Sequence, residues 1–211
     1  SRKRQLSPSH NQSTSKQFPI INIGNSNHSR PPLPLPYSRA AAIGHLMPKD
    51  AIIADESVTS GRGLMPFTAG TEQHDWLSLT GGSIGIGMPY ATGAAIACPD
   101  RTVISLAGDG SGMYTLQAVG TQAREKCDFG NVIFAHRTYE ILKGELMNVG
   151  AENPGRKAVD MLEIVRPDLD WRQLAQGMGV PATRATTADE FNEQFKRALN
   201  EPGPHLIEAW M

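Results

Sequence analysis

Short apolar runs alternate with helical patterns from residue 37 to the end of the chain. Five runs of four to six residues, bounded by polar or glycine-rich turns, predict strands at residues 51–54, 76–79, 102–107, 131–135 and 206–210. Helices are predicted between and around them, at residues 37–47, 88–98, 113–126, 171–178 and 187–200. Strands that alternate with helices predict an α/β fold: a three-layer, doubly wound, mainly parallel sheet with helices on both faces.

Residues 1–36 differ from the rest of the chain in composition. They hold five Lys and Arg residues, no Asp or Glu, and a proline-rich run at residues 31–36. Such a stretch buries too little apolar surface to fold alone, so we interpret it as a flexible basic linker or the boundary of a cut fragment. A basic, acid-free, Ser-rich start also resembles an organelle transit peptide. The folded domain is expected over residues 37–211.

Charge and cysteine usage exclude several classes of partner. The 211 residues carry a formal net charge of −1, and no apolar run approaches the roughly 18 residues that span a bilayer. We therefore expect no nucleic acid and no membrane as partners. Cys98 and Cys127 form no CxxC pair, which is typical of reduced thiols inside a cell. A cytoplasmic location follows, or an organelle if the basic start is native.

Four polar or glycine-rich loops adjoin the strand ends where ligands bind in an open parallel sheet. They are residues 55–60, 81–87, 108–111 and 136–139. In the third loop, Gly108 and Gly110 let the backbone approach a ligand closely, and Ser111 can donate to a phosphate. Asp109 fits a phosphate site if a divalent cation bridges the two. The alternative is a plain strand-to-helix turn capped by Ser111.

A second set of candidate ligands lies 27 residues after Asp109, at His136. One predicted helix and one predicted strand fill the interval, so a single strand–helix–strand step returns the chain to the same edge of the sheet. The His136 side chain and the Thr138 carbonyl could then complete a metal site. Otherwise His136 is a neighbouring or surface residue outside the ligand set.

These motifs resemble the thiamine-diphosphate signature, in which Gly-Asp-Gly is followed after about one strand–helix–strand unit by an asparagine. The likeness covers residues 37–211. It is to the C-terminal, diphosphate-binding domain of acetolactate synthase large subunits and benzoylformate decarboxylase. Residues 55–60 resemble the family's phosphate-contacting turn, and residues 81–85 resemble the loop that grips the aminopyrimidine. The family's order and spacing also continue at Met88-Pro89, residues 108–111 and residues 132–142.

The resemblance implies a set of site residues. The implied ligands of Mg²⁺ are Asp109, His136 and the carbonyl of Thr138. The residues implied to contact thiamine diphosphate are Thr59, Gly82, Ile84, Gly108, Gly110, Ser111 and Tyr139. The Gly82 carbonyl would accept from the 4′-amino group, and Ile84 would bend the cofactor. Bound in this way, the cofactor would serve as the electron sink for decarboxylation or carboligation of a 2-keto acid.

Two features depart from the family's pattern. Position 136 is His where the family has Asn, and because Mg²⁺ prefers oxygen ligands whereas imidazole suits softer metals, Mn²⁺ becomes an alternative ion. The family also takes its activating glutamate from a pyrimidine-binding domain across a dimer interface, and residues 1–36 cannot form that domain. We interpret Glu56 as a turn residue that can face the substrate, not as this base. Arg62, Arg137 and Lys143 either meet a substrate carboxylate or are solvated loop charges.

Two functions stay open at this point. The first is the cofactor-binding domain of an acetolactate-synthase-like enzyme, a homodimer or tetramer completed by a pyrimidine-binding domain in the same or another chain. The second is a non-catalytic α/β binding module, such as a degenerate homologue with a defective metal site. A P-loop or dinucleotide domain is disfavoured, because the chain has no GxxxxGK[ST] motif and no acidic ribose ligand at the usual distance. Exposed flat faces of an isolated domain also predict self-association.

Overall fold

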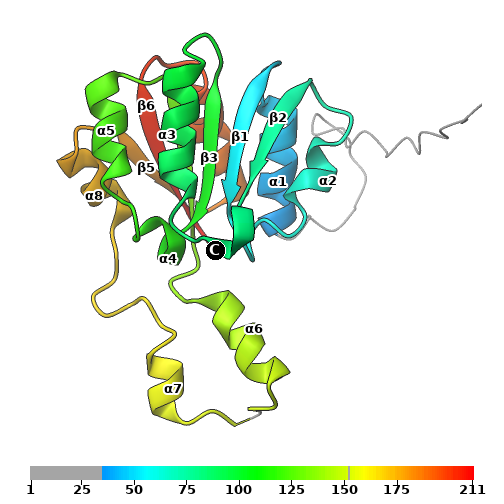
Figure 1. The fold of residues 1–211 in the computed structure, drawn as a ribbon, viewed down its shortest axis with the longest axis vertical. Coiled ribbons are helices and arrows are strands. Elements are labelled where there is room, and N and C mark those ends of the chain that lie inside the picture. Colours follow the sequence, from blue (N-terminus) through cyan, green and yellow to red (C-terminus); the bar gives the residue numbers. More distant parts are fainter. Residues whose placement is uncertain (1–34, 152) are drawn as a thin grey trace, which may run out of the picture. The chain divides into compact units, whose positions relative to one another are not determined.

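One parallel sheet organises the domain. The structure, a computed structural model, describes residues 35–151 and 153–211. The strands are β1 (Ala51–Glu56), β2 (His74–Ser78), β3 (Val103–Gly108), β4 (Phe129–Ala135), β5 (Ala182–Ala185) and β6 (Pro204–Trp210). They lie in the order β2-β1-β3-β4-β6-β5, and every neighbouring pair is parallel (Figure 1).

Helices cover both faces of the sheet. One face carries α1 (Leu35–Leu46), α2 (Leu64–Thr68) and α9 (Ala188–Ala198), and the other carries α3 (Gly87–Ala97), α5 (Ala118–Glu125) and α8 (Trp171–Gly177). Neighbouring residues of β3 enter opposite layers, with Ile104 and Leu106 on the first face and Val103 and Ala107 on the second. The predicted three-layer, doubly wound α/β fold is therefore confirmed.

The central strands read as continuous apolar runs because both of their faces are covered. All seven residues of β4 are buried, including one polar side chain, Asn131. Its amide donates to Oε1 of Gln122 on α5 at 2.8 Å, and the Gln122 amide donates to Thr92 on α3 at 3.0 Å. Because these buried polar groups satisfy one another, their hydrogen bonds offset the cost of burial and tie α3 and α5 to the sheet.

Several elements were not predicted from the sequence. They are α2, β5, η1 (Thr80–Gly82), α4 (Asp109–Gly112), α6 (Glu140–Asn148) and α7 (Arg156–Asp160). The predicted helix at residues 113–126 is wrong over its first five residues, because α5 begins only at Ala118. The hydroxyl of Thr115 donates to the carbonyl of Gly85 at 2.6 Å, which ties this segment to the glycine loop of residues 81–87. Of the predicted arm at residues 1–36, residues 1–34 lie outside the described chain.

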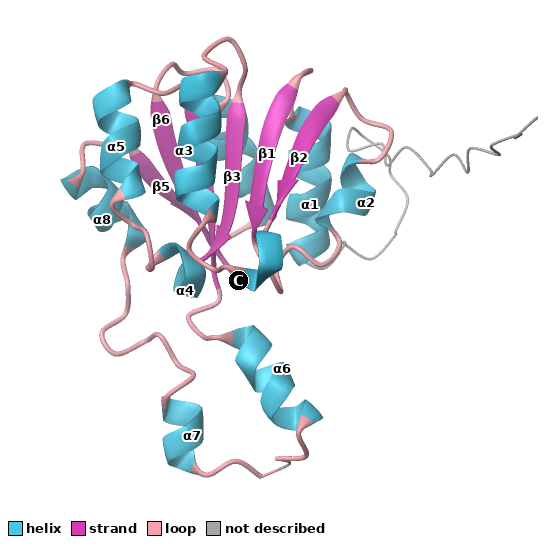
Figure 2. Cartoon of the chain, viewed as in Figure 1, coloured by secondary structure: helices cyan, strands magenta, loops and turns pink. Residues whose placement is uncertain are grey.

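Between β4 and α8 the chain leaves the sheet. This excursion, residues 136–170, carries α6 and α7 beyond the carboxyl edge of the sheet (Figure 2). Its two ends meet: Thr138 and Glu163 form an antiparallel bridge, and Arg137 pairs with Asp168 at 2.8 Å. The excursion is therefore closed at its base, next to the strand ends.

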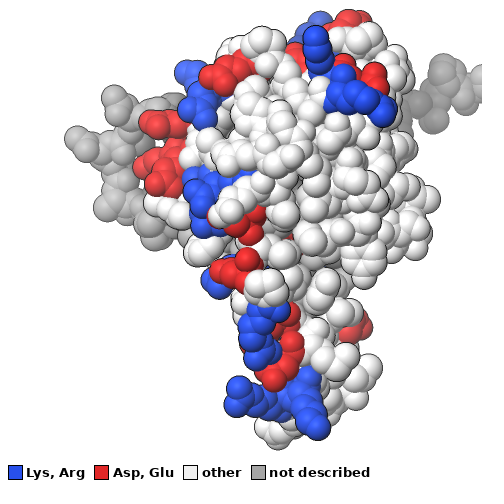
Figure 3. All heavy atoms as spheres, turned by 90° about the vertical axis from the view of Figure 1, so that its left-hand side faces the viewer, with Lys and Arg blue, Asp and Glu red and all other residues white. Residues whose placement is uncertain are grey.

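The surface has charged and uncharged regions. In Figure 3, Lys, Arg, Asp and Glu lie in mixed groups on the side of α5 and α8 and along the excursion, beside a broad area without charge. Helix α3 contains no charged residue, and its Tyr90 and Ile96 are 40% and 55% exposed. Among the described residues, no helix has the length and apolar character needed to cross a membrane.

Candidate cofactor site

Four loops meet at the carboxyl edge of the sheet. The loops after β1 and β4 touch where the Ser60 hydroxyl lies 2.5 Å from Nε2 of His136. The turn after β3 begins with Asp109, whose Oδ2 accepts from the backbone N–H of Arg137 at 2.5 Å. The glycine loop joins this group through Thr115. The structure thus brings together the loops that the sequence places at neighbouring strand ends.

Asp109 is a buried carboxylate, 4% exposed. Its Oδ1 accepts from the N–H of Gly110 at 2.9 Å, in addition to the bond from Arg137. Burial raises its pKa to about 6, although these backbone donors act in the opposite direction. Within residues 35–151 and 153–211, no Lys or Arg forms an ion pair with it. A divalent cation would supply the missing positive charge, so this oxygen donor fits a metal site.

His136 is half-buried at the end of β4. Burial lowers its pKa, although Glu140 acts in the opposite direction. The lowered pKa favours the neutral imidazole, which is the form that metals bind. Its Nε2 is engaged with the Ser60 hydroxyl, which can either donate to or accept from the ring, so the bond is compatible with both tautomers. The third predicted ligand, the Thr138 carbonyl, accepts from the N–H of Glu140 at 3.0 Å and has a second lone pair available.

Side chains alone do not complete a metal centre here. No group of three or more His, Cys, Asp or Glu residues in the described part of the chain could hold an ion. The predicted set contains only two such side chains, Asp109 and His136, with a backbone carbonyl as the third ligand. The metal site therefore stays a prediction.

The glycine loop is shaped by left-handed backbone conformations. Gly81, Gly82 and Gly85 have φ of 61°, 69° and 91°, which residues with a Cβ rarely adopt. The Gly82 carbonyl, predicted to meet the cofactor's amino group, accepts from the N–H of Ile84 at 2.9 Å. Ile84 itself is 42% exposed at this edge. Both predicted contacts are thus presented on the surface of the loop.

The turn after β3 packs against Tyr139. A Cβ added to Gly110 would lie 2.6 Å from Cε1 of the Tyr139 ring, so a side chain there would force Tyr139 to move. The Ser111 hydroxyl donates to the carbonyl of Gly108 at 3.1 Å and would have to rotate to donate to a phosphate. Thr59 lies half-buried in the turn after β1. All the residues predicted for the diphosphate therefore border this edge.

Glu56 corrects one sequence interpretation. It is the last residue of β1 and 1% exposed, not a turn residue that faces a substrate. Its carboxylate accepts from the backbone N–H groups of Gly85 and Gly87. Arg137 pairs with Asp168 and Lys143 with Glu140, all with partly exposed side chains, and Arg62 is exposed, so both alternatives stay open for these three cations.

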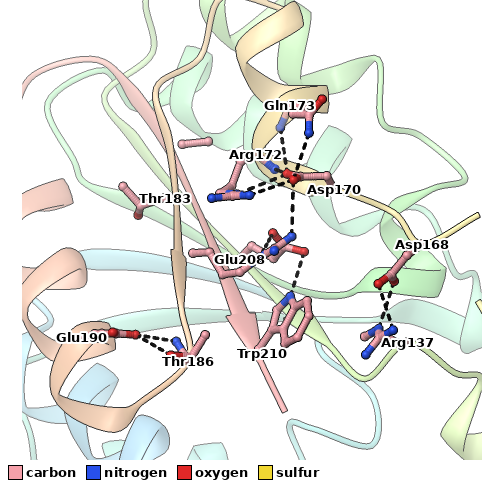
Figure 4. A network of polar contacts seen from close by, with 12 residues as sticks. Arg137, Asp168, Asp170, Arg172, Gln173, Thr183, Thr186, Glu190, Glu208 and Trp210 are labelled. Atoms are coloured by element: carbon pink, nitrogen blue, oxygen red, sulfur yellow. Dashed lines mark hydrogen bonds and ion pairs between the residues drawn. The ribbon is translucent and has the colours of Figure 1, made fainter. Parts of the chain in front are cut away.

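A polar network supports the loop after β4 (Figure 4). Two guanidinium groups lie over the Trp210 ring, with Arg137 at 5.0 Å and Arg184 at 4.5 Å from its centroid. The indole N–H donates to Oε1 of Glu208 at 3.2 Å, and Arg184 donates to Oε2 at 2.9 Å. Because Arg137 also pairs with Asp168, the residue between the two predicted ligands of this loop is held from two sides.

Comparison with known proteins identifies the family of the domain. Residues 60–209 match the family described as "Thiamine pyrophosphate enzyme, C-terminal TPP binding domain". The chain belongs to this family. The matched span includes every predicted site residue except Thr59, which immediately precedes it. The resemblance inferred from the motifs is confirmed.

Individual relatives place the TPP-binding domain within longer enzymes. The candidate acetolactate synthase large subunit IlvX of Mycobacterium tuberculosis is 51% identical over 186 residues, which cover 86% of this chain and 36% of that protein. Benzoylformate decarboxylase of Pseudomonas aeruginosa is 32% identical over 170 residues, covering 79% and 30%. The thiamine diphosphate-dependent 4-hydroxybenzoylformate decarboxylase of Rhodococcus jostii RHA1 superposes with a TM-score of 0.74 at 30% identity, covering 92% and 36%. The chain thus spans about a third of the length of these relatives.

Proposed function

We propose that the TPP-binding domain holds thiamine diphosphate and a divalent cation at the carboxyl edge of its sheet, as part of an enzyme that acts on 2-keto acids. Asp109 carries the proposal. It is a buried carboxylate without a cationic partner in the described chain, and its Oδ2 is tied to the loop that follows β4. A cation at this position would neutralise the carboxylate and attract the diphosphate.

Asp109, His136 and the Thr138 carbonyl would hold the metal. Mg²⁺ would be bound less tightly than by an all-oxygen set, and Mn²⁺ would tolerate the imidazole better. Gly110, Ser111 and Thr59 would contact the diphosphate. When bound, thiamine diphosphate supplies an electron sink for chemistry at the carbonyl of a 2-keto acid.

The remaining parts of the site are proposed to come from another domain. The activating glutamate would belong to a pyrimidine-binding domain, in the same or another chain, as the resemblance implies. Helix α3, which has no charged residue and exposes Tyr90 and Ile96, supports association in a homodimer or tetramer. Acetolactate-synthase-like carboligation and decarboxylation are the proposed activities.

One observation favours the second candidate, a binding module without catalysis. His136 stands where the family has Asn, and its Nε2 already contacts Ser60. While that contact persists, only Nδ1 of His136 could bind the metal; if Nδ1 points away from Asp109, the metal would lose one ligand and the cofactor would lose its bridge.

Calorimetric titration of thiamine diphosphate into the chain separates these functions, with Mg²⁺, with Mn²⁺ and with EDTA. The proposal expects metal-dependent binding that Asp109→Ala removes and Asp128→Ala leaves unchanged, because Asp128 is an exposed carboxylate just before β4, at the opposite end of that strand. Binding that appears only in His136→Asn would favour the degenerate module. Binding to wild type that is independent of metal would contradict the site proposed around Asp109.

A further inference from the structure

Glu56 is the least explained charged group near the site. Its side chain is 1% exposed, and no Lys or Arg in the described chain pairs with it. Burying a carboxylate in this way is costly unless its oxygens are fully hydrogen-bonded. Both oxygens find partners in one place: Oε1 accepts from the N–H of Gly85, and Oε2 accepts from the N–H of Gly87 at 2.7 Å. The carboxylate is therefore directed entirely at the glycine loop.

The contact is too close to allow other residues in the loop. A Cβ at Gly87 would lie 2.5 Å from Oε2 of Glu56 and 2.7 Å from its Cβ. A Cβ at Gly85 would lie 2.7 Å from Cβ of Tyr114, and Gly85 also has a φ of 91°. The loop thus lies pressed between β1 and the segment after α4, and neither glycine can be replaced without moving one of these neighbours.

Glu56 also links the glycine loop to the turn that carries the predicted diphosphate contacts. Its backbone carbonyl lies 3.5 Å from the hydroxyl of Ser111. On the far side, Thr115 donates to the carbonyl of Gly85 at 2.6 Å. The same loop is thus held by a side chain from β1 and by a side chain that follows the turn after β3.

We propose that Glu56 is a positioning residue, whose carboxylate holds the glycine loop so that Gly82 and Ile84 meet the aminopyrimidine end of the cofactor. The inference rests on the proposed function and adds a residue that acts only through the loop. Outer residues that orient metal ligands commonly change metal affinity or activity by about ten- to a hundredfold. The same range is expected here.

Glu56→Gln tests this, because the amide keeps the shape of the side chain but turns one acceptor into a donor that faces an N–H. Glu208→Gln is the matched control. Glu208 is also 1% exposed and also lies on a strand of the same sheet, but its partners are Arg184 and Trp210. Two quantities are measured in each variant: amide hydrogen exchange across residues 81–87 without cofactor, and the dissociation constant of thiamine diphosphate with Mn²⁺.

The proposal expects Glu56→Gln to accelerate exchange at Gly85 and Gly87 and to weaken cofactor binding at least about tenfold. Glu208→Gln should lower global stability and leave exchange across residues 81–87 unchanged, because Glu208 makes no contact with this loop. Unchanged exchange in Glu56→Gln, or equal acceleration of exchange in both variants, would overturn the positioning role. Because exchange needs no cofactor, failure of wild type to bind would count against the proposed function alone. If Glu56→Gln does not fold, Glu56→Asp, which keeps the charge but shortens the reach, is expected to give the same changes to a smaller extent.

Discussion

The buried carboxylate of Asp109 predicts that the metal-free chain becomes less stable as the pH rises. Burial raises its pKa from 3.8 to about 6. Between these two pH values the folded chain holds a proton that the unfolded chain has released, so rising pH favours unfolding. The slope is about 1.4 kcal/mol per pH unit, which amounts to about 3 kcal/mol across the window.

The comparison of wild type with Asp109→Asn isolates this effect, because asparagine carries no titrating proton and the other groups are shared. Both proteins are unfolded by urea in EDTA at several pH values from about 4.5 to about 7.5, and tryptophan fluorescence gives each free energy of unfolding. The value for wild type, relative to the variant, should fall as the pH rises and level off above about pH 7. With Mn²⁺ present the trend should reverse, because the metal favours the ionised carboxylate.

If the difference in free energy of unfolding between wild type and Asp109→Asn stays constant with pH, the predicted protonation of Asp109 is refuted. It would mean that the N–H groups of Gly110 and Arg137 fully offset the burial of Asp109. The carboxylate would then be ionised in the folded chain without any metal, and the need for a cation would disappear from the argument.

Three further predictions concern stability. Arg184→Met leaves the buried Glu208 carboxylate without its cation, so chemical denaturation should show a loss of about 3 kcal/mol, and a loss below about 1 kcal/mol would be inconsistent with a buried pair. Thr187→Ala removes the capping box of α9 and should cost about 1 kcal/mol in thermal unfolding, whereas Thr187→Ser should be near neutral. Gly93 lies in α3, and a Cβ there would meet no atom within 4 Å, so Gly93→Ala should stabilise the chain by about 0.5–1 kcal/mol, whereas Gly87→Ala should destabilise it. A Gly87→Ala variant more stable than Gly93→Ala would contradict the packing.

The central strands could be predicted from the sequence because burial on both faces leaves a direct trace in it. Residues 102–107 and 131–135 are apolar runs that end at polar turns, and β3 and β4 match them to within two residues. β5 leaves no such trace. Its four residues, Ala182–Ala185, lie at the edge of the sheet and are mostly half-buried, so only pairing with β6 reveals the strand.

The helices of the excursion were not predicted for a related reason. Neither α6 nor α7 buries a residue in the described structure, so there is no apolar face whose period could be recognised. The delayed start of α5 has another cause. The bond from Thr115 to Gly85 joins residues 30 positions apart, and local propensity cannot reveal such a contact.

The candidate site was largely predictable in its position, because parallel strands bring their carboxyl ends to one edge. The role of Glu56 was not. A carboxylate that follows an apolar run resembles the start of a turn, and its partners are backbone N–H groups 29 and 31 residues away. The only sequence signal is the pair Gly85 and Gly87 in the loop, whose lack of side chains is explained once the carboxylate lies beside them.

Backbone strain shows how distant parts of the chain support the site. Arg137 has a φ of 61°, and such a conformation costs a residue with a Cβ on the order of 1 kcal/mol or more. Its N–H donates to Asp109, its carbonyl accepts from Ile164, and its guanidinium contacts Asp168 and Trp210. These contacts come from the turn after β3, the far end of the excursion and the last strand, and together they hold the peptide that presents both predicted ligands of this loop. The excursion and the last strand therefore stabilise a loop geometry that the local sequence would not adopt alone, and the ligand positions depend on residues that would never touch the metal.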